Sequence, residues 1–198
     1  MQYNRSERTR REIMNAAVAL FCQSGYDAAS VSHICERAGV SKGAFYHHFP
    51  SKQTLFLAIL EDWLGGIDDQ LVHARAANEP VTDSLTRMAE TIGVVFQVAS
   101  GQLPMFMEFM VQASRDAAVW DAAIAPYRRY QQRFADLIAE GQREGSVRAD
   151  LEPHIIAWVL ISLAVGILLQ GVVDPHAADW QQVTRQGIQM LLQGIQKE

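Results

Sequence analysis

Apolar residues recur at intervals of three and four along almost the whole chain, and this helical spacing restricts its fold most. Residues 13–21 carry five apolar side chains on one face, and Thr9 and Glu12 have the spacing of a capping box before them. No segment alternates polar and apolar residues as a strand does. The sequence predicts an all-α protein of about nine helices, expected over residues 9–23, 31–38, 42–48, 51–67, 81–99, 105–114, 117–144, 153–173 and 180–196, with punctuation at Gly101–Pro104.

Charge is distributed unevenly along the 198 residues, whose net charge is −5. Residues 1–52 carry seven Lys/Arg and four acidic residues, a net charge of +3. The remainder carries ten Lys/Arg and 18 acidic residues, a net charge of −8. An acidic body repels phosphate, so a polyanionic partner is expected to bind the first fifty residues.

Two short helices joined by a tight turn are predicted in the first quarter of the chain. Ser30 can cap the first of them, and Gly39 tolerates the left-handed conformation that ends it. Ser41 can cap the next helix, which Pro50 closes. Two helices in this arrangement form a helix-turn-helix, whose second helix enters the DNA major groove.

The string GYDAASVSHICERAGVSKGAFYHHFPSKQTLFLAIL, residues 25–60, closely resembles the N-terminal DNA-binding domain of the TetR family of bacterial transcriptional regulators. Its most specific portion is AGVSKGAFYHHFPSK, residues 38–52. The later order MEFMVQASRD, followed by a long Arg-rich helix, is similar to BetI-like members. The resemblance implies a three-helix DNA-binding head, residues 1–52, and a helical ligand-binding and dimerisation body, residues 53–198.

Residues expected to contact DNA lie on and around the third helix. Phe45 and Phe49 are four apart and face inward, which leaves Lys42 and Tyr46 for the groove. The resemblance assigns Lys52 a phosphate contact. The arginines at positions 5, 8, 10 and 11 can add phosphate contacts or simply form a solvated helix start. The full predicted set is Ser30, Ser32, His33, Lys42, Gly43, Ala44, Tyr46, His47 and Lys52.

Enzymatic, metal and cofactor chemistry find no support in the sequence. The body contains no Gly-rich phosphate loop, nucleophile elbow or Ser/His/Asp set at a motif spacing. His47 and His48 are adjacent and point about 100° apart on a helix, so they cannot share one ion. Cys22 and Cys35 lie on or beside apolar faces, which favours inert thiols over the alternative of a redox pair.

The body is rich in methionine and aromatic side chains, which can line an adaptable apolar pocket or form a plain core. The resemblance implies a ligand pocket inside this body, and we expect a largely apolar small-molecule effector. Glu108 and the Tyr127 hydroxyl are the polar groups expected to orient it. The predicted ligand-binding residues are Trp63, Phe96, Met105, Glu108, Phe109, Trp120, Tyr127 and Trp158.

Residues 155–173 contain no charged side chain and are long enough to span a bilayer. Neither flank is basic, and a helix that is apolar all round also suits burial between a domain core and a second subunit. We therefore expect no membrane span, and a dimer formed by this helix with residues 180–196. The N-terminus lacks the apolar segment of a secretory signal, so a cytoplasmic protein is expected.

These features together favour a homodimeric, ligand-responsive transcriptional regulator, and more specifically a repressor, that binds a pseudo-palindromic duplex operator. One alternative is an all-α module that binds an apolar small molecule and has no DNA-binding role. Another is a membrane-anchored helical protein. Salt-dependent binding to duplex DNA separates the first function from the second, and behaviour without detergent separates it from the third.

Overall fold

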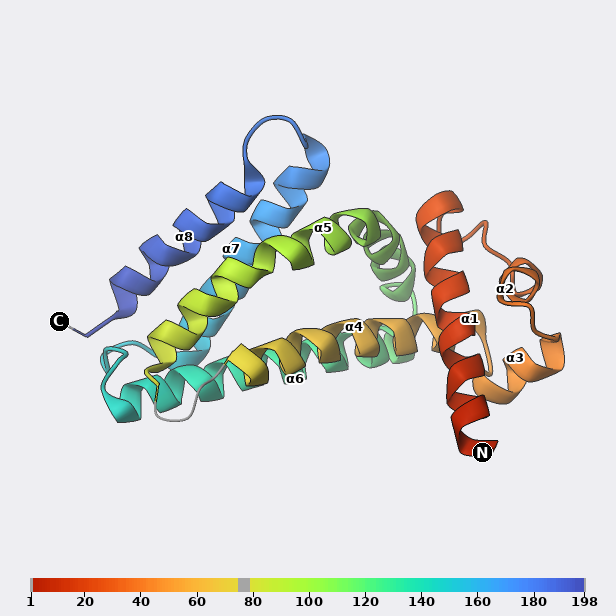
Figure 1. The fold of residues 1–198 in the computed structure, drawn as a ribbon, viewed down its shortest axis with the longest axis horizontal. Coiled ribbons are helices and arrows are strands. Elements are labelled where there is room, and N and C mark those ends of the chain that lie inside the picture. The colour runs from red at the N-terminus through yellow and green to blue at the C-terminus, as the bar shows by residue number, and fades with distance from the viewer. Residues whose placement is uncertain (1, 75–78, 198) are drawn as a thin grey trace. The chain divides into compact units, whose positions relative to one another are not determined.

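A computed structural model of the chain describes the backbone of residues 2–74 and 79–197, and the side chains of residues 5–66, 79–88 and 102–197. Within these ranges the chain is helical, with one isolated bridge between Val147 and Gln196 and no strand, which confirms the all-α class. The helices in Figure 1 are α1 (Gln2–Ser24), α2 (Val31–Ala38), α3 (Lys42–His48), α4 (Lys52–Ala74), α5 (Val81–Ala113), α6 (Ala117–Glu144), α7 (Pro153–Val173) and α8 (Trp180–Ile195).

Three expected helix boundaries are wrong. Helix α4 ends at Ala74, beyond the expected end at residue 67. The break at Gly101–Pro104 is absent, because α5 continues through Pro104. Proline removes one backbone hydrogen bond and distorts a helix, but the periodic segments on both sides remain helical. Helix α1 begins at Gln2, so Thr9 and Glu12 lie inside the helix and do not form a capping box at its start.

The chain divides into two compact units. The first unit comprises Met1–Trp63 and Gln102–Ile124, and the second comprises Leu64–Gly101 and Ala125–Glu198. Helices α4, α5 and α6 each contribute one part to each unit. The first unit therefore contains the predicted head together with segments of the predicted body, and a head that ends at residue 52 stays a prediction.

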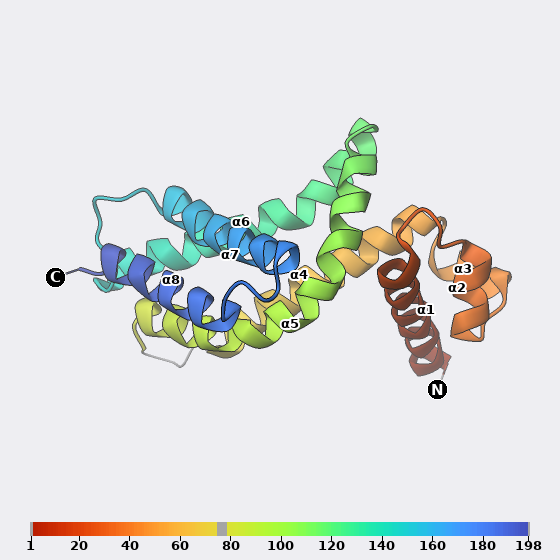
Figure 2. The same cartoon turned by 90° about the horizontal axis from the view of Figure 1, so that it is seen from above.

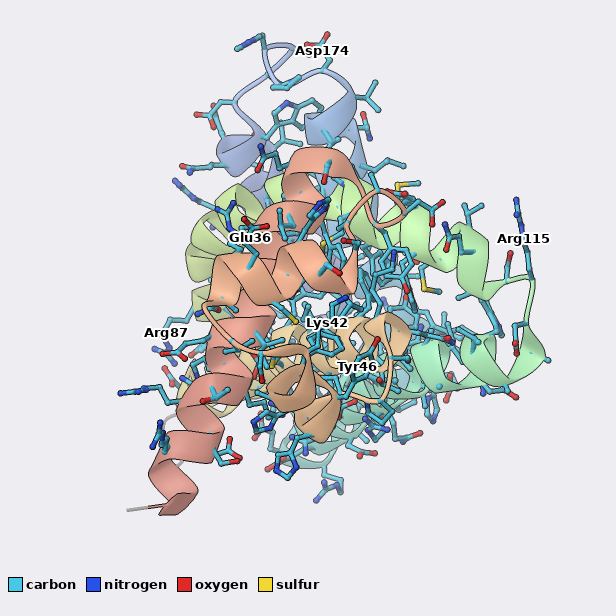
Figure 3. The ribbon with its side chains drawn as sticks, turned by 90° about the vertical axis from the view of Figure 1, so that its right-hand side faces the viewer. Glu36, Lys42, Tyr46, Arg87, Arg115 and Asp174 are labelled. Atoms are coloured by element: carbon cyan, nitrogen blue, oxygen red, sulfur yellow. The ribbon has the colours of Figure 1, made fainter. Side chains whose placement is uncertain are left out.

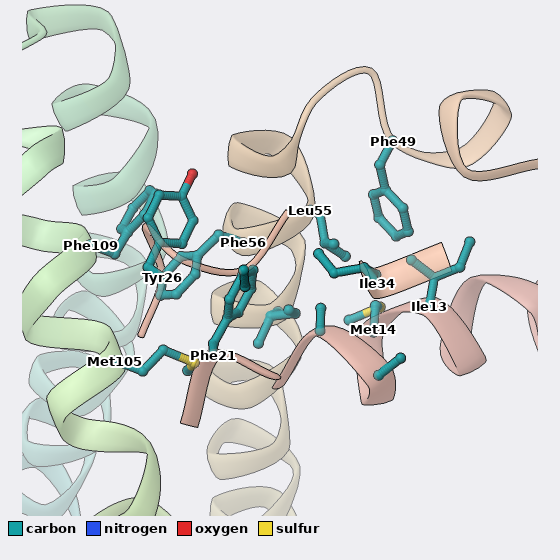
Figure 4. Close-up of a cluster of buried hydrophobic side chains, with 14 of the residues drawn as sticks. Ile13, Met14, Phe21, Tyr26, Ile34, Phe49, Leu55, Phe56, Met105 and Phe109 are labelled. Atoms are coloured by element: carbon teal, nitrogen blue, oxygen red, sulfur yellow. The ribbon is translucent and has the colours of Figure 1, made fainter. Parts of the chain in front are cut away.

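The core of the first unit is built around aromatic side chains (Figure 4). Phe21 from α1, Tyr26 from the following turn and Phe56 from α4 meet there, with ring centroids 5.2–5.8 Å apart. Phe109 from α5 completes the group by stacking on Phe56, with centroids 3.9 Å apart. Such pairs add to the stabilisation that comes from burial alone. The α4 and α5 segments of this unit thus share one core with α1–α3.

The second unit packs α7 and α8 side by side, as Figures 1 and 2 both show. Ile156, Leu160 and Ile161 of α7 are buried together with Ile188 and Leu192 of α8. Helix α7 is long and apolar enough to cross a membrane by length and composition, and 33% of its most apolar window is buried. Six of its large apolar side chains are exposed on this single chain, namely Ile155, Trp158, Val159, Val165, Leu169 and Val173.

Candidate nucleic-acid interface

The turn between α2 and α3 has the local structure that its sequence predicts. Ser30 accepts a hydrogen bond from the His33 N–H at 3.2 Å and caps α2. Gly39 ends α2 with φ 65°, a left-handed conformation in which a side chain is strained. Ser41 caps α3 by accepting from the Ala44 N–H at 3.1 Å. The predicted helix-turn-helix is therefore present.

Helix α3 turns one face into the core and the other to solvent. Phe45 and Phe49 are buried. Tyr46 is 53% exposed and Lys42 is exposed, and both project from α3 in Figure 3. A side chain at Gly43 would have Ser41 Oγ at 3.7 Å as its nearest neighbour, so internal packing does not require glycine there. The absence of a side chain instead leaves this end of α3 open to close approach from outside.

Most of the other predicted DNA-contacting residues are also on the surface. Ser30, Ser32, His33 and His47 are exposed, whereas Ala44 is half-buried. Within the described part of the chain, no group of three His, Cys, Asp or Glu side chains is arranged to hold a metal ion. The exposed polar positions of α2 and the N-terminal part of α3 thus form a surface that can donate hydrogen bonds to phosphate and to base edges.

Lys52 is placed differently from the other cations of this region. Its Nζ donates to the Tyr26 carbonyl oxygen at 2.7 Å and to the Asp27 carbonyl oxygen at 3.3 Å. It also lies 4.3 Å from the centroid of the Tyr26 ring, a cation–π distance. Burial lowers the pKa of Lys52, and the nearby carboxylates of Asp27 and Glu108 oppose that shift. Two of its three N–H donors therefore serve the protein itself.

Glu108 of α5 binds the backbone N–H groups of the same turn. Its carboxylate accepts hydrogen bonds from the Tyr26 N–H at 2.9 Å and from the Asp27 N–H at 3.1 Å. Gly25 precedes these residues with φ 84°, and a Cβ there would lie 2.9 Å from Glu108 Oε2. Gly25 is thus required both by its backbone conformation and by the approach of the carboxylate.

Comparison with known proteins identifies the architecture. A family model described as bacterial regulatory proteins, tetR family, matches residues 13–59. A second, described as BetI-type transcriptional repressor, C-terminal, matches residues 80–193, more than half of the chain. The chain belongs to the TetR family. Its division into a TetR-type N-terminal segment and a BetI-type C-terminal segment agrees with the resemblances seen in the sequence.

Individual relatives are similar to this TetR-family chain over most of their length. The HTH-type transcriptional regulator UidR of Escherichia coli K12 is 27% identical over 94% of this chain and 92% of its own. The HTH-type transcriptional repressor KstR2 of Mycobacterium tuberculosis H37Rv is 27% identical over 96% of this chain and 94% of its own. The structure of Salmonella enterica GusR superposes with a TM-score of 0.70 at 24% identity, covering 94% of this chain and 96% of that one.

The predicted ligand-binding residues of this TetR-family chain are divided between the two units. Met105 and Phe109 are buried in the first core, and Trp120 packs against it. Trp63 also belongs to this unit, with its ring centroid 6.5 Å from that of Phe106. In the second unit Tyr127 packs against the core and Trp158 is 54% exposed, while the side chain of Phe96 lies outside the described residues.

Glu108, predicted to orient a ligand, has backbone partners in the turn after α1. Sequence reasoning missed this role because 82 residues separate Glu108 from Tyr26 and no local pattern connects them. The glycine at position 25 is a partial sequence signal, because glycine is favoured where the backbone adopts a positive φ, as Gly25 does here. It does not show which distant residue contacts the turn. A ligand contact by Glu108 stays a prediction.

Two of the N-terminal arginines have neighbours on α1 or at the C-cap of α3. Arg8 forms a 3.4 Å ion pair with Glu12, and both side chains are exposed. The Arg10 guanidinium lies 5.3 Å from the Phe49 ring centroid. Surface pairs of this kind contribute little stability and are easily exchanged for other partners. Phosphate contacts by these arginines stay predictions.

Replacing Gly25 by alanine should lower the free energy of unfolding of the protein by about 1–3 kcal/mol, the cost of a residue held in a sparsely populated backbone conformation. The new Cβ would also displace the Glu108 carboxylate. Urea unfolding followed by circular dichroism measures the change. Gly65→Ala is the control, since a Cβ at Gly65 meets nothing within 4 Å. Equal stability of the two variants would contradict the assignment.

Proposed function

We propose that this TetR-family protein is a dimeric, ligand-responsive repressor that binds a pseudo-palindromic DNA operator through α3. The observation that carries the proposal is the two-sided α3, which presents Lys42 and Tyr46 to solvent. Phe45 and the C-cap residue Phe49 are buried on its other side. A helix anchored in this way can enter the major groove without rearrangement of its core. The name repressor, carried by relatives such as KstR2, supports the direction of regulation.

Electrostatics supports the same surface. Residues 1–52 have a net charge of +3, whereas the remainder has −8. Phosphate attraction therefore favours the segment that contains α2 and α3, and the acidic remainder discourages non-specific binding elsewhere. Each phosphate that a cation neutralises contributes salt-dependent affinity. We expect operator affinity to fall steeply as the salt concentration rises.

Dimerisation follows from the symmetry of a pseudo-palindromic operator, which needs two heads related by a two-fold axis. We propose that α7 and α8 form the interface.

The effector is proposed to be a largely apolar small molecule that favours a state whose head spacing no longer fits the operator. The predicted ligand residues that are half-buried or exposed on the described chain are Trp63, Glu108, Trp120, Tyr127 and Trp158. We place the protein in the cytoplasm, where its operator is accessible.

The test begins with selection of a binding duplex from a random-sequence pool, since no operator sequence is needed for it. Tyr46→Ala and Lys42→Glu should each weaken binding to the selected duplex at least ten-fold, because each removes a contact worth ~1–3 kcal/mol. Gel shift and fluorescence anisotropy measure the affinity. Helical content should stay unchanged, since both side chains are exposed.

Arg143→Glu is the matched control, because it makes the same charge reversal at an exposed residue of the second unit. It should bind the selected duplex as the parent does. Parental binding by both α3 variants would refute the recognition helix. If the parent itself selects no duplex, the protein is instead a small-molecule-binding module without a DNA-binding role.

A further inference from the structure

Lys52 and Glu108 contact the same two residues of the turn that follows α1. We propose that both are positioning residues for the DNA-binding helices, holding the Tyr26–Asp27 turn through its backbone N–H and carbonyl groups, and that neither side chain contacts DNA. This inference rests on the proposed operator binding. It departs from the phosphate contact that the family resemblance implies for Lys52.

The four hydrogen bonds at the turn involve every backbone polar group of Tyr26 and Asp27. Glu108 takes both N–H groups, at 2.9 and 3.1 Å, and Lys52 Nζ donates to both carbonyl oxygens, at 2.7 and 3.3 Å. Charge-assisted hydrogen bonds are stronger than neutral ones. These hydrogen bonds connect the first residue of α4, Lys52, and Glu108 of α5 to the Tyr26–Asp27 turn.

Aromatic contacts reinforce the same connection. The Tyr26 ring is nearly perpendicular to Phe56 of α4 and to Phe109 of α5, with centroids 5.4 and 5.3 Å away. Lys52 Nζ lies over the Tyr26 ring, so one side chain meets both the backbone and the ring of this residue. The turn leads from Ser24 to Ser30, the cap of α2. Its position therefore determines where α2, and α3 after it, begin.

The charges around Lys52 oppose a phosphate contact. Burial lowers the pKa of its ammonium, and the nearby Asp27 and Glu108 carboxylates oppose that lowering. A DNA phosphate approaching the third N–H donor would meet this negative charge at short range. Lys42, by contrast, lies on the exposed face of α3 that the proposed function turns toward DNA. Replacing Lys42 should therefore change the salt dependence of duplex binding, whereas replacing Lys52 should not.

Salt dependence separates a phosphate-contacting lysine from a positioning one. With the duplex selected from the random pool, Lys52→Met should weaken binding at least five-fold and leave the slope of log affinity against log salt unchanged. A lysine that neutralises a phosphate should reduce that slope by ~0.9 when it is replaced, and Lys42→Met is the comparison. Methionine keeps most of the hydrocarbon stem of lysine.

Glu108→Gln should also weaken duplex binding at least five-fold with an unchanged slope, because an amide offers one acceptor oxygen and turns a donor toward the other N–H group. The double variant should lose less than the product of the two single losses, since both act on one turn. Asp121→Asn, an exposed carboxylate of α6 in the same unit, is the matched control and should bind as the parent does.

Amide hydrogen exchange supplies a direct readout of the turn. The Tyr26 and Asp27 amides should exchange at least ten-fold faster in Glu108→Gln, while those of Leu192 in the second unit stay protected. Ile188→Val creates a small cavity in the second core and tests whether loss of stability alone weakens duplex binding. We expect this variant to bind the duplex as the parent does. If Lys52→Met does not fold, Glu108→Gln and this exchange measurement still decide.

A reduced salt slope in Lys52→Met, or parental affinity in Glu108→Gln, would overturn the inference while leaving operator binding intact. A parent protein that selects no duplex would instead refute the proposed function. The two failures are therefore distinguishable in one series of measurements.

Discussion

Replacing Phe109 by alanine should lower the free energy of unfolding by about 3–5 kcal/mol, the range for a large aromatic side chain removed from a close-packed core. Phe109 is 2% exposed and stacks on Phe56 with ring centroids 3.9 Å apart. It also meets the edge of the Tyr26 ring at 5.3 Å. Its removal takes α5 out of the aromatic group that it shares with α1 and α4.

Urea unfolding followed by circular dichroism and by aromatic absorbance measures this loss. Met107→Ala is the matched control, because Met107 lies on the same helix and is 47% exposed. A surface substitution of this kind usually changes stability by less than about 0.5 kcal/mol. A loss below about 1 kcal/mol in Phe109→Ala would show that its ring is not part of the core. The result matters for function, because the same core supports the turn before α2.

Features of the fold that depend on neighbouring residues could be predicted from the sequence. Ser30, Gly39 and Ser41 act on backbone groups within four positions of themselves, so their capping roles can be recognised without the rest of the chain. Phe45 and Phe49 follow from helical periodicity in the same way. Local sequence is therefore sufficient to predict the helix-turn-helix and the exposed face of α3.

Features that depend on distant residues could not be predicted in this way. Periodicity shows that Met105 and Phe109 lie on a buried face of α5, but not which core they enter. The sequence predicts them as pocket residues, and the structure buries them in the core that contains Phe21 and Phe56. A ligand contact by either residue stays a prediction. Glu108 is the sharpest case, because a half-buried carboxylate suits a ligand or two backbone amides equally well until its partners are known.

The second unit presents an apolar stripe that one chain does not cover. Trp158, Val165 and Leu169 of α7 are exposed at intervals of seven and four, and Met190 of α8 is 72% exposed. The opposite side of α7 is buried against the core of its own unit. Spacing of this kind places one continuous seam along a helix, the geometry of helix pairs that bury each other. A second copy of α7 and α8 is the occupant that the proposed two-fold symmetry supplies.

Val165→Glu should therefore convert the protein from a dimer to a monomer at micromolar concentration, weakening the dimer at least 100-fold. Val165 is 47% exposed near the middle of the stripe, and the symmetry of a dimer would bury two new carboxylates without partners. Removing charge from water without a partner costs several kcal/mol, far more than the few tenths expected for the same change on an open surface. Duplex affinity should also fall in this variant, because a monomer has one head and binds only one half-site.

Sedimentation in buffer without detergent measures the oligomeric state, and the parent should be a stable dimer there. Val111→Glu is the control, because Val111 is 60% exposed on α5 in the first unit and receives the same substitution away from α7 and α8. It should remain dimeric. A monomeric parent would contradict the proposed assembly, and a dimeric Val165→Glu would move the interface to another surface. A parent that needs detergent would instead favour a membrane role for α7, the only helix of the described residues with sufficient length and hydropathy.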